Sequence, residues 1–378
     1  MRLKITLWMT AVFFLSILPL HAGYYSDAYD AYKAKNYDKS IQILEEGLQA
    51  APNDEQLAML LGQVYFKIRN IEKAEKAFQK TVSLNPDDDT AQYYLGICYT
   101  LRQENGQPKP AWFEASQAFG KAVELKPDDP RYNYQYGHSL MMLRKFQQAK
   151  EPLEKAYATE EGRNDYKIPT DLGVIYQTMN MNTEAIEMFE KAIELNPEKT
   201  APYQYLGGLY MAERNYDKVK ELGEKLITLM PDDGKGYSYR GYGQLMAKEF
   251  SAAEDTFTKA IELDPTDPNY YYQRGLAREG KIGTDAGSYK SLIDDYAKAI
   301  SLSSDSIPDE WHYRLGHAYE LQATLYWDRA FRHEESRTNC LHNLRKARQE
   351  YLSAGENEDA KRQLETVNER IRQLEVIR

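Results

Sequence analysis

Cysteine is nearly absent from this chain. Cys98 and Cys340 are the two that its 378 residues contain. Two thiols cannot form the set of bridges that holds a small disulfide-rich secreted fold together. They also lie far apart in the sequence, so we interpret them as two separate, half-buried thiols and not as a disulfide.

An excess of basic residues is also lacking. The formal net charge is −10, whereas a protein that neutralises nucleic-acid phosphates needs a basic face, so no nucleic-acid partner is expected. With 42% hydrophobic and 28% charged residues, the chain has the composition of a folded protein and not of a disordered one. Tyrosine is frequent, with 31 copies, and its apolar ring with a polar end suits half-exposed surfaces and interfaces.

Complete catalytic motifs are missing as well. The stretch over residues 236–240 lacks the final glycine of a nucleophile elbow, and the pair His333-Glu334 lacks the second histidine of a zinc-protease helix. His312 and His317 are five residues apart, which places them off one helical face. We therefore predict no catalytic, cofactor-binding or metal-binding residue, no cofactor, and no enzyme.

The N-terminus carries the chain's one long apolar run. Arg2 and Lys4 precede an almost wholly apolar stretch over residues 5–18, and the small residue Ala22 follows. This length and order are typical of a secretory signal peptide, and the run is short for a membrane span. We predict a signal peptide over residues 1–22 and export to the periplasm or cell envelope of a bacterium. An uncleaved anchor is the alternative and would be the only contact with a membrane.

Two independent markers recur along the chain with one period, 34 residues in most places and longer where polar loops intervene. One marker is a glycine within an expected helix: Gly62, Gly96, Gly137, Gly173, Gly207, Gly241, Gly275 and Gly316. The other is a turn proline: Pro52, Pro86, Pro127, Pro197, Pro231 and Pro265. Because glycine weakens a helix interior, a fixed phase of glycines indicates close helix–helix approach. Acidic clusters follow several of the prolines, and we interpret them as helix N-caps and not as calcium ligands.

The most regular stretch, residues 183–210, reads as the second helix of one hairpin followed by the first helix of the next. The recurring pattern resembles the tetratricopeptide repeat. Its positions are matched most fully by Leu95–Gly96–Tyr99 with Ala115, Phe119, Ala122 and Pro127, and by Leu172–Gly173–Tyr176 with Ala185, Phe189, Ala192 and Pro197. The resemblance implies an all-α superhelical solenoid of about nine antiparallel helix hairpins with a C-terminal capping helix.

The expected solenoid spans residues 23–355, and a capping helix follows over 356–378. The units are expected near 24–54, 55–88, 89–129, 130–165, 166–199, 200–233, 234–267, 268–306 and 307–352. The sixth has Val219 and Gly223 where alanine and phenylalanine are expected, so we predict looser packing of its second helix. The ninth is expected to have a lengthened first helix. Loops are expected over 103–110 and 280–288. The apolar stripe of the tail favours a cap, with a partner-binding helix as the alternative.

The resemblance also implies that first helices line a concave groove. The phase of the glycines places an aromatic and methionine-rich group of residues there. Our candidates for the partner-binding groove are Tyr93, Ile97, Tyr134, His138, Met141, Met142, Gln177, Gln204, Met211, Tyr242, Met246, Tyr272, Tyr313 and His317. Apolar groups that face solvent in a row mark an interaction surface. The alternative is that neighbouring hairpins bury some of them. The family's carboxylate clamp is not expected, because asparagine is absent from these positions and lysine is limited to Lys167 and Lys235.

These observations predict an exported, non-catalytic scaffold that binds a protein or peptide segment in its groove, within an envelope assembly or secretion complex. A second hypothesis is an envelope enzyme or carbohydrate-binding protein with a site near His317 and His333 in the irregular C-terminal third. The sequence leaves the oligomeric state open.

Overall fold

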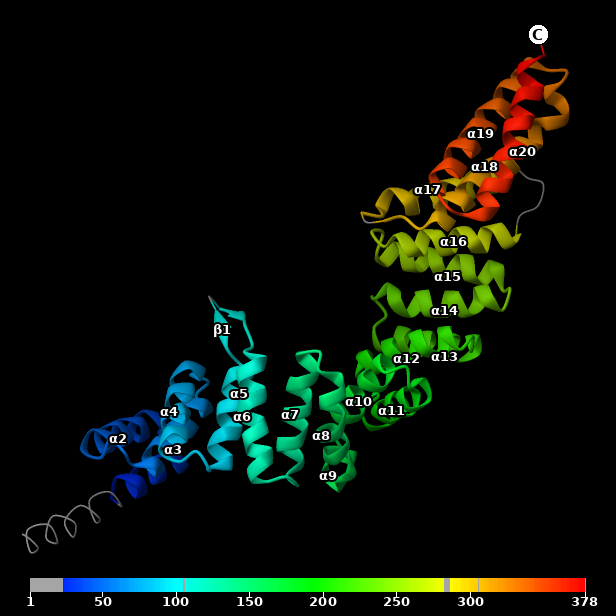
Figure 1. Cartoon of the computed structure of the whole chain (residues 1–378). Helices are drawn as coiled ribbons and strands as arrows, with labels where there is room; N and C mark the ends of the chain where they lie inside the picture. The colour runs from blue at the N-terminus through cyan, green and yellow to red at the C-terminus, as the bar shows by residue number, and fades with distance from the viewer. Residues whose placement is uncertain (1–22, 105, 282–285, 305, 378) are drawn as a thin grey trace, which may run out of the picture. The chain divides into compact units, whose positions relative to one another are not determined.

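The computed structural model describes residues 23–377 except 105, 282–285 and 305. The predicted signal peptide and part of the second expected loop therefore lie outside the described residues. The chain divides into two compact units, residues 1–197 and 198–378. Both consist of antiparallel helix pairs, so the predicted all-α stack is confirmed (Figure 1). No described helix combines the length and apolarity needed to cross a membrane.

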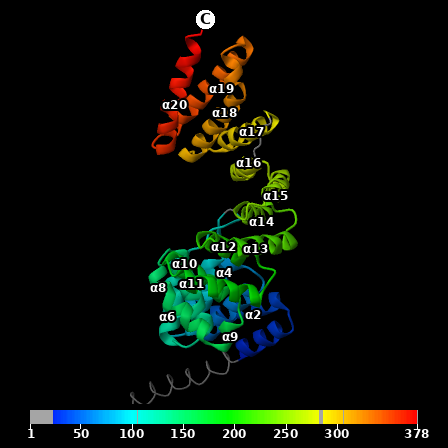
Figure 2. The same ribbon diagram turned by 90° about the vertical axis from the view of Figure 1, so that its right-hand side faces the viewer.

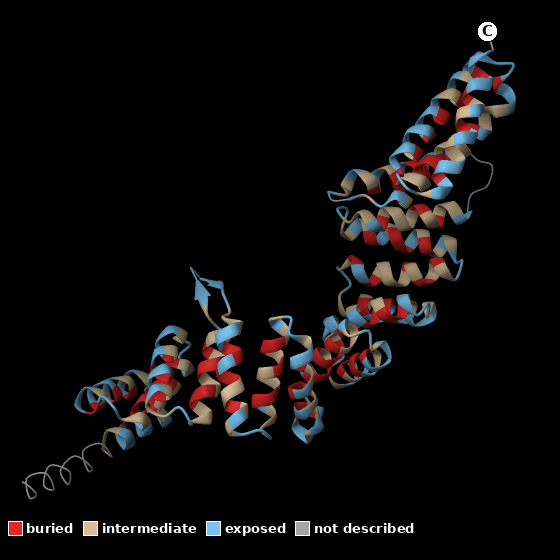
Figure 3. Cartoon of the chain, viewed as in Figure 1, coloured by how far each residue is buried: buried red, intermediate tan, exposed pale blue. Residues whose placement is uncertain are grey.

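Within its described residues, unit 1 contains five helix pairs in chain order. The first pairs a helix over residues 23–33 with α2 (Tyr37–Ala50). The others are α3 (Glu55–Lys67) with α4 (Ile71–Leu84), α5 (Asp89–Thr100) with α6 (Trp112–Leu125), α7 (Pro130–Met142) with α8 (Phe146–Ala158), and α10 (Lys167–Thr178) with α11 (Asn182–Leu195). Buried residues gather on the helix faces turned toward one another (Figure 3).

The described part of unit 2 contains four helix pairs and a final helix. The pairs are α12 (Thr200–Ala212) with α13 (Tyr216–Leu229), α14 (Gly234–Met246) with α15 (Phe250–Leu263), α16 (Pro268–Lys281) with α17 (Ala286–Leu302), and α18 (Asp309–Ala330) with α19 (Glu334–Ser353). With 22 residues, α18 is the lengthened first helix that the sequence predicted. The last helix, α20 (Glu358–Glu375), packs on α19 and α18 and buries Val367, Ile371 and Leu374 (Figure 2).

Two connections contain regular structure that we did not expect. The ends of the predicted loop over residues 103–110 pair as an exposed two-residue antiparallel ladder, β1 (Gln103–Glu104) with β2 (Gln107–Pro108). The extra residues after α8 form a four-residue helix, α9 (Glu160–Arg163), which Thr159 caps. In both places the backbone finds hydrogen-bond partners locally, which a pattern of turn residues does not reveal.

The two kinds of turn differ in chemistry. Between hairpins, aspartates cap the next helix: a carboxylate oxygen of Asp88 accepts backbone N–H bonds from Thr90 and Ala91, as the N-cap interpretation predicted. Within hairpins, six described residues other than glycine have a φ close to 60°, and five of them are basic. They are Lys35, Arg69, Arg144, Asn180, Arg214 and Lys248.

The glycines allow close helix approach, as their phase indicated. A Cβ placed at Gly62 would lie 2.6 Å from the ring of Phe78, which belongs to the second helix of the same hairpin. The sixth hairpin departs from this rule because Gly223 stands where the large residue should be. There the Tyr239 ring of α14 covers Gly207, and a Cβ on Gly207 would lie 2.6 Å from it.

Gly223 itself lies against the backbone of α14. A Cβ there would be 2.3 Å from the backbone nitrogen of Arg240 and 2.7 Å from the carbonyl oxygen of Gly236. The prediction that α13 packs loosely is therefore wrong for its contact with α14, whereas its contact with α12 of the same hairpin is less extensive than the contacts within the neighbouring hairpins, as predicted. The missing phenylalanine lets the two backbones touch, and Leu222 and Leu226 of the same helix are buried.

Both cysteines are free, Cys98 in unit 1 and Cys340 in unit 2. They are fully buried, so the interpretation of half-buried thiols is wrong in degree. The Sγ of Cys340 lies 3.4 Å from the carbonyl oxygen of Ala323, inside the core that α18, α19 and α20 share.

Candidate functional site

In unit 1, three successive first helices, α5, α7 and α10, enclose a hollow of about 190 Å³ together with α9. We call it the unit 1 hollow. Two of the predicted groove residues, Tyr93 and Tyr134, line it. The remaining walls are Pro130, Arg131, Gln135, Glu161, Gly162, Asp165, Lys167 and Ile168. We call the surface formed by the first helices of successive hairpins the first-helix face. Aromatic rings and charges of both signs therefore meet at this point of it.

The two tyrosines of the unit 1 hollow pack against neighbouring rings. The ring of Tyr93 lies 5.0 Å from that of Tyr132, and burial raises the pKa of the Tyr93 hydroxyl. The ring of Tyr134 lies 5.7 Å from that of His138, and burial raises the Tyr134 pKa strongly. Both phenols therefore stay protonated at neutral pH and present O–H groups that can donate hydrogen bonds.

In unit 2, three successive first helices, α12, α14 and α16, enclose a hollow of about 300 Å³. We call it the unit 2 hollow. Three predicted groove residues, Gln204, Met211 and Tyr242, line it. The remaining walls are Lys235, Ser238, Tyr239, Asp267, Asn269, Tyr270 and Gln273. The lining is thus rich in amides and hydroxyls.

One polar atom of the unit 2 hollow lacks a partner. The Gln273 side-chain oxygen is buried and accepts no hydrogen bond from the described part of the chain. A buried acceptor without a partner costs roughly 1–3 kcal/mol, so such atoms are rare in folded proteins. The residues that line the hollow therefore include one acceptor that no described donor satisfies.

Several predicted groove residues are engaged by neighbouring hairpins instead. The Nδ1 of His138 lies 2.7 Å from a carboxylate oxygen of the buried Asp171. Tyr272 stacks on Trp311 with ring centroids 4.9 Å apart, and burial raises its pKa to about 12. Such contacts match the alternative interpretation of the sequence, in which neighbouring hairpins bury some of the predicted groove residues.

The same applies to Tyr313 and His317. Their rings stack with centroids 6.2 Å apart, and the Nδ1 of His317 lies 3.7 Å from a carboxylate oxygen of Glu279. Neither residue lines the unit 2 hollow. The stack lies within α18, and the contact of His317 with Glu279 joins α18 to α16.

The remaining candidates lie outside both hollows. Met141 and Met246 pack partly buried on the cores of their own units. Ile97 and Gln177 are half-buried, whereas Met142 is 45% exposed. Of these five, Met142 offers the most accessible apolar surface.

Sequence reasoning missed the polar part of the unit 2 lining. Ser238 precedes Tyr242 by about one helical turn, so the period that selected Tyr242 would have found it too. The aromatic pattern could not select Gln273, because it marked the adjacent Tyr272 instead.

Asn269 is a further residue that the predicted groove positions do not include. This residue lines the unit 2 hollow, and its side-chain nitrogen donates to a carboxylate oxygen of Asp267 at 2.9 Å. It lies in the first turn of α16, about one helical turn before Tyr272, where the aromatic pattern marked no groove residue.

The histidines of the C-terminal third do not converge. The Nδ1 of His312 lies 2.8 Å from a carboxylate oxygen of Glu350, while His333 and His342 are exposed. Among the residues that the structure describes, no three histidine, cysteine, aspartate or glutamate side chains are placed to hold a metal ion.

Family models of the tetratricopeptide repeat match residues 31–103 and 170–199, and neither describes an enzyme. The chain thus contains tetratricopeptide repeats within its stack of helix pairs. A comparison with curated proteins finds no match.

Several solved structures are similar to parts of the chain. They include YrrB, described as a TPR protein with an unusual peptide-binding site, at 22% identity over 50% of this chain and 93% of that one, with a TM-score of 0.44. The pilF protein of Pseudomonas aeruginosa matches at 18% identity over 58% of this chain and 95% of that one, with a TM-score of 0.46. MamA of Desulfovibrio magneticus RS-1 matches at 22% identity over 47% of this chain and 93% of that one, with a TM-score of 0.40.

Proposed function

We propose that this chain is an exported, non-catalytic scaffold whose first-helix face binds a segment of another protein within a bacterial envelope assembly. The observation that carries the proposal is the unit 2 hollow with its unpartnered Gln273 oxygen. The tetratricopeptide repeats support a protein partner, and the apolar N-terminal segment supports export.

The chemistry of the unit 2 hollow defines what it binds. Tyr242 and Met211 supply apolar surface, and the Gln273 oxygen is an acceptor that no described donor satisfies. Lys235 is exposed and makes no ion pair with another described residue. An extended peptide matches this set, because its backbone N–H groups donate and its side chains fill the apolar part.

Site-specific photo-crosslinking in envelope preparations tests the proposal. A photoreactive amino acid at Ser238 in the hollow should trap a discrete partner, whereas the same group at the exposed Asp255 of α15 should not. Gln273→Met keeps the side-chain length but removes the acceptor, so it should reduce trapping at Ser238 without lowering helicity. Equal trapping at both positions, or no effect of Gln273→Met, would refute a site in this hollow.

Export is tested separately. A C-terminally tagged chain should fractionate with the periplasm or envelope, and its intact mass should correspond to the loss of residues 1–22. An unprocessed chain in the membrane fraction would replace the cleaved signal by an uncleaved anchor. A chain found in the cytoplasm would refute export.

A further inference from the structure

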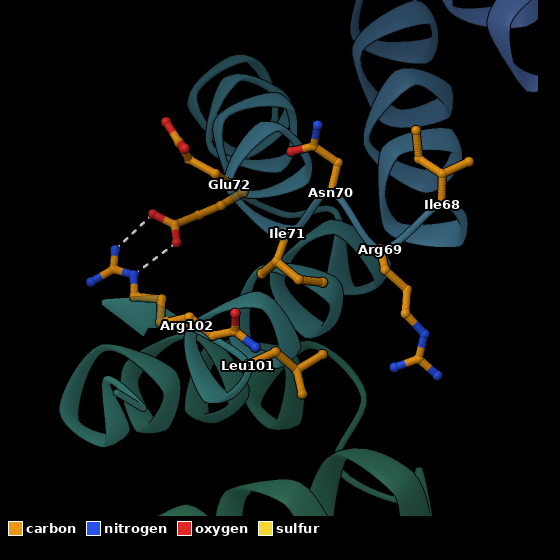
Figure 4. A pocket seen from close by; sticks show the side chains of 9 residues that line it. Ile68, Arg69, Asn70, Ile71, Glu72, Leu101 and Arg102 are labelled. Atoms are coloured by element: carbon orange, nitrogen blue, oxygen red, sulfur yellow. Dashed lines mark hydrogen bonds and ion pairs between the residues drawn. The ribbon is translucent and has the colours of Figure 1, made fainter. Parts of the chain in front are cut away.

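A further hollow of unit 1 has a volume of about 800 Å³. It lies between the turn that joins α3 to α4 and the end of α5, and we call it the turn-edge hollow (Figure 4). It shares no lining residue with the unit 1 hollow or the unit 2 hollow. Whatever it binds can therefore be separated experimentally from a ligand of the first-helix face.

One wall of the turn-edge hollow is apolar and open to solvent. Ile68 is 39% exposed and Leu101 is 44% exposed, and both are C-caps of first helices. Figure 4 shows Ile71 and Leu101 between Arg69 and Arg102. Exposed apolar groups that converge on a concavity gain free energy when another apolar group covers them.

The charges around this wall are compensated except for one. Glu72 pairs with Lys76 at 2.6 Å. Glu75 holds Arg102 through two contacts of 2.6 and 2.8 Å, which the dashed lines of Figure 4 mark. The Arg69 guanidinium makes no ion pair or hydrogen bond with any described residue. The uncompensated charge at the hollow is therefore positive.

Arg69 also occupies a backbone position that does not favour arginine. Its φ is 61°, in the left-handed region that glycine adopts at much lower cost. Its place just after α3 gives a favourable interaction with the helix dipole. That interaction explains a cation at the turn, but it does not explain why an open apolar wall lies beside it.

We propose that the turn-edge hollow binds an acidic protein segment in which a carboxylate lies beside a branched apolar side chain. The carboxylate pairs with Arg69, and the apolar side chain covers Ile71 and Leu101. We choose an acidic partner on charge complementarity. Among the charged residues that line the hollow, Arg69 is the one that forms no ion pair with a described residue. A concave site favours a protruding side chain over the flat surface of an anionic membrane.

The test uses the full chain and a fluorescein-labelled peptide in which glutamate alternates with leucine. Anisotropy titrations compare it with peptides that carry lysine or glutamine in place of glutamate, and a sedimentation assay with phosphatidylglycerol vesicles runs in parallel. The glutamate peptide should bind best, and added salt should weaken its binding.

Arg69→Gly is the decisive variant. It removes the cation and relieves the backbone, so it should leave the melting temperature unchanged or raised. The same variant should weaken binding of the glutamate peptide roughly fivefold, the value of an exposed charge pair. Leu101→Gln removes apolar surface at an exposed position and should weaken binding by a similar factor.

Arg144→Gly is the matched control, because Arg144 has a φ of 59° at the equivalent turn and does not line the hollow. It should bind the glutamate peptide as the unchanged chain does. The proposal is overturned if Arg69→Gly and Arg144→Gly bind equally well, or if the glutamate peptide binds no better than the lysine peptide. Binding to the vesicles alone would assign the hollow to lipid and also overturn it.

Discussion

Gly223→Ala is the variant for which the structure and the repeat pattern predict opposite changes in stability. In other hairpins the equivalent position holds a large residue such as Phe78 or Phe189, so the pattern alone predicts that a larger side chain at Gly223 is stabilising. The structure predicts the opposite. The new Cβ would lie 2.3 Å from the Arg240 nitrogen and 2.7 Å from the Gly236 oxygen. Both are backbone atoms, so neither can swing away.

The magnitude follows from two opposing terms. Alanine gains about 1 kcal/mol over glycine in a helix interior. Overpacking costs about 1–3 kcal/mol, and the upper part of that range applies because α13 and α14 must separate. The net expectation is a loss of about 1–2 kcal/mol. Gly208→Ala is the control: no atom lies within 4 Å of its Cβ, so only the helical gain remains.

Thermal denaturation followed by circular dichroism should separate the two variants by on the order of 5–10 °C if unit 2 unfolds cooperatively. Amide hydrogen exchange should show the loss in α13 and α14, because stability in repeat arrays is largely local. If Gly223→Ala raised the melting temperature as much as Gly208→Ala does, the close backbone contact between α13 and α14 would be refuted.

Three further predictions follow from other parts of the structure. Gly207→Leu should lower the melting temperature because its Cβ would lie 2.6 Å from the Tyr239 ring, and adding Tyr239→Ala should restore part of the loss; an unchanged melting temperature would contradict this packing role. Burial raises the pKa of Glu279, but the hydrogen bonds it accepts and the charge of Arg314 outweigh burial, so its pKa is lowered overall. The ionised Glu279 therefore stabilises the folded chain above the unfolded carboxyl pKa of about 4.3, and this contribution is lost as the pH falls through the lower folded pKa. Glu279→Gln should make the free energy of unfolding, measured by urea titration, fall less steeply at acidic pH. An unchanged pH dependence would argue against the pairing. Burial raises the pKa of Cys98 to about 12 and that of Cys340 to about 11, so a thiol reagent at mildly alkaline pH should label both only after unfolding, and rapid labelling of the native chain would show that they are accessible.

Part of the candidate site could be predicted from the sequence. The helical phase placed Tyr93, Tyr134 and Tyr242 on the first-helix face, where they line the unit 1 hollow and the unit 2 hollow. The turn-edge hollow could not be predicted, because it joins Ile68 and Leu101 from different hairpins. Their proximity depends on how the hairpins stack, and no local pattern encodes it.

The sequence by itself determined the all-α architecture. Glycines and prolines of one period mark helix interiors and turns, because glycine permits close approach and proline ends a helix. Only the tertiary structure decided which side chains remain available to a partner. His138 shares the phase of Tyr242, yet Asp171 of the next hairpin engages it, whereas the Gln273 oxygen of the unit 2 hollow meets no described donor. The physical reason is that the helical period selects a face, while the packing of neighbouring hairpins determines which polar groups on that face are satisfied.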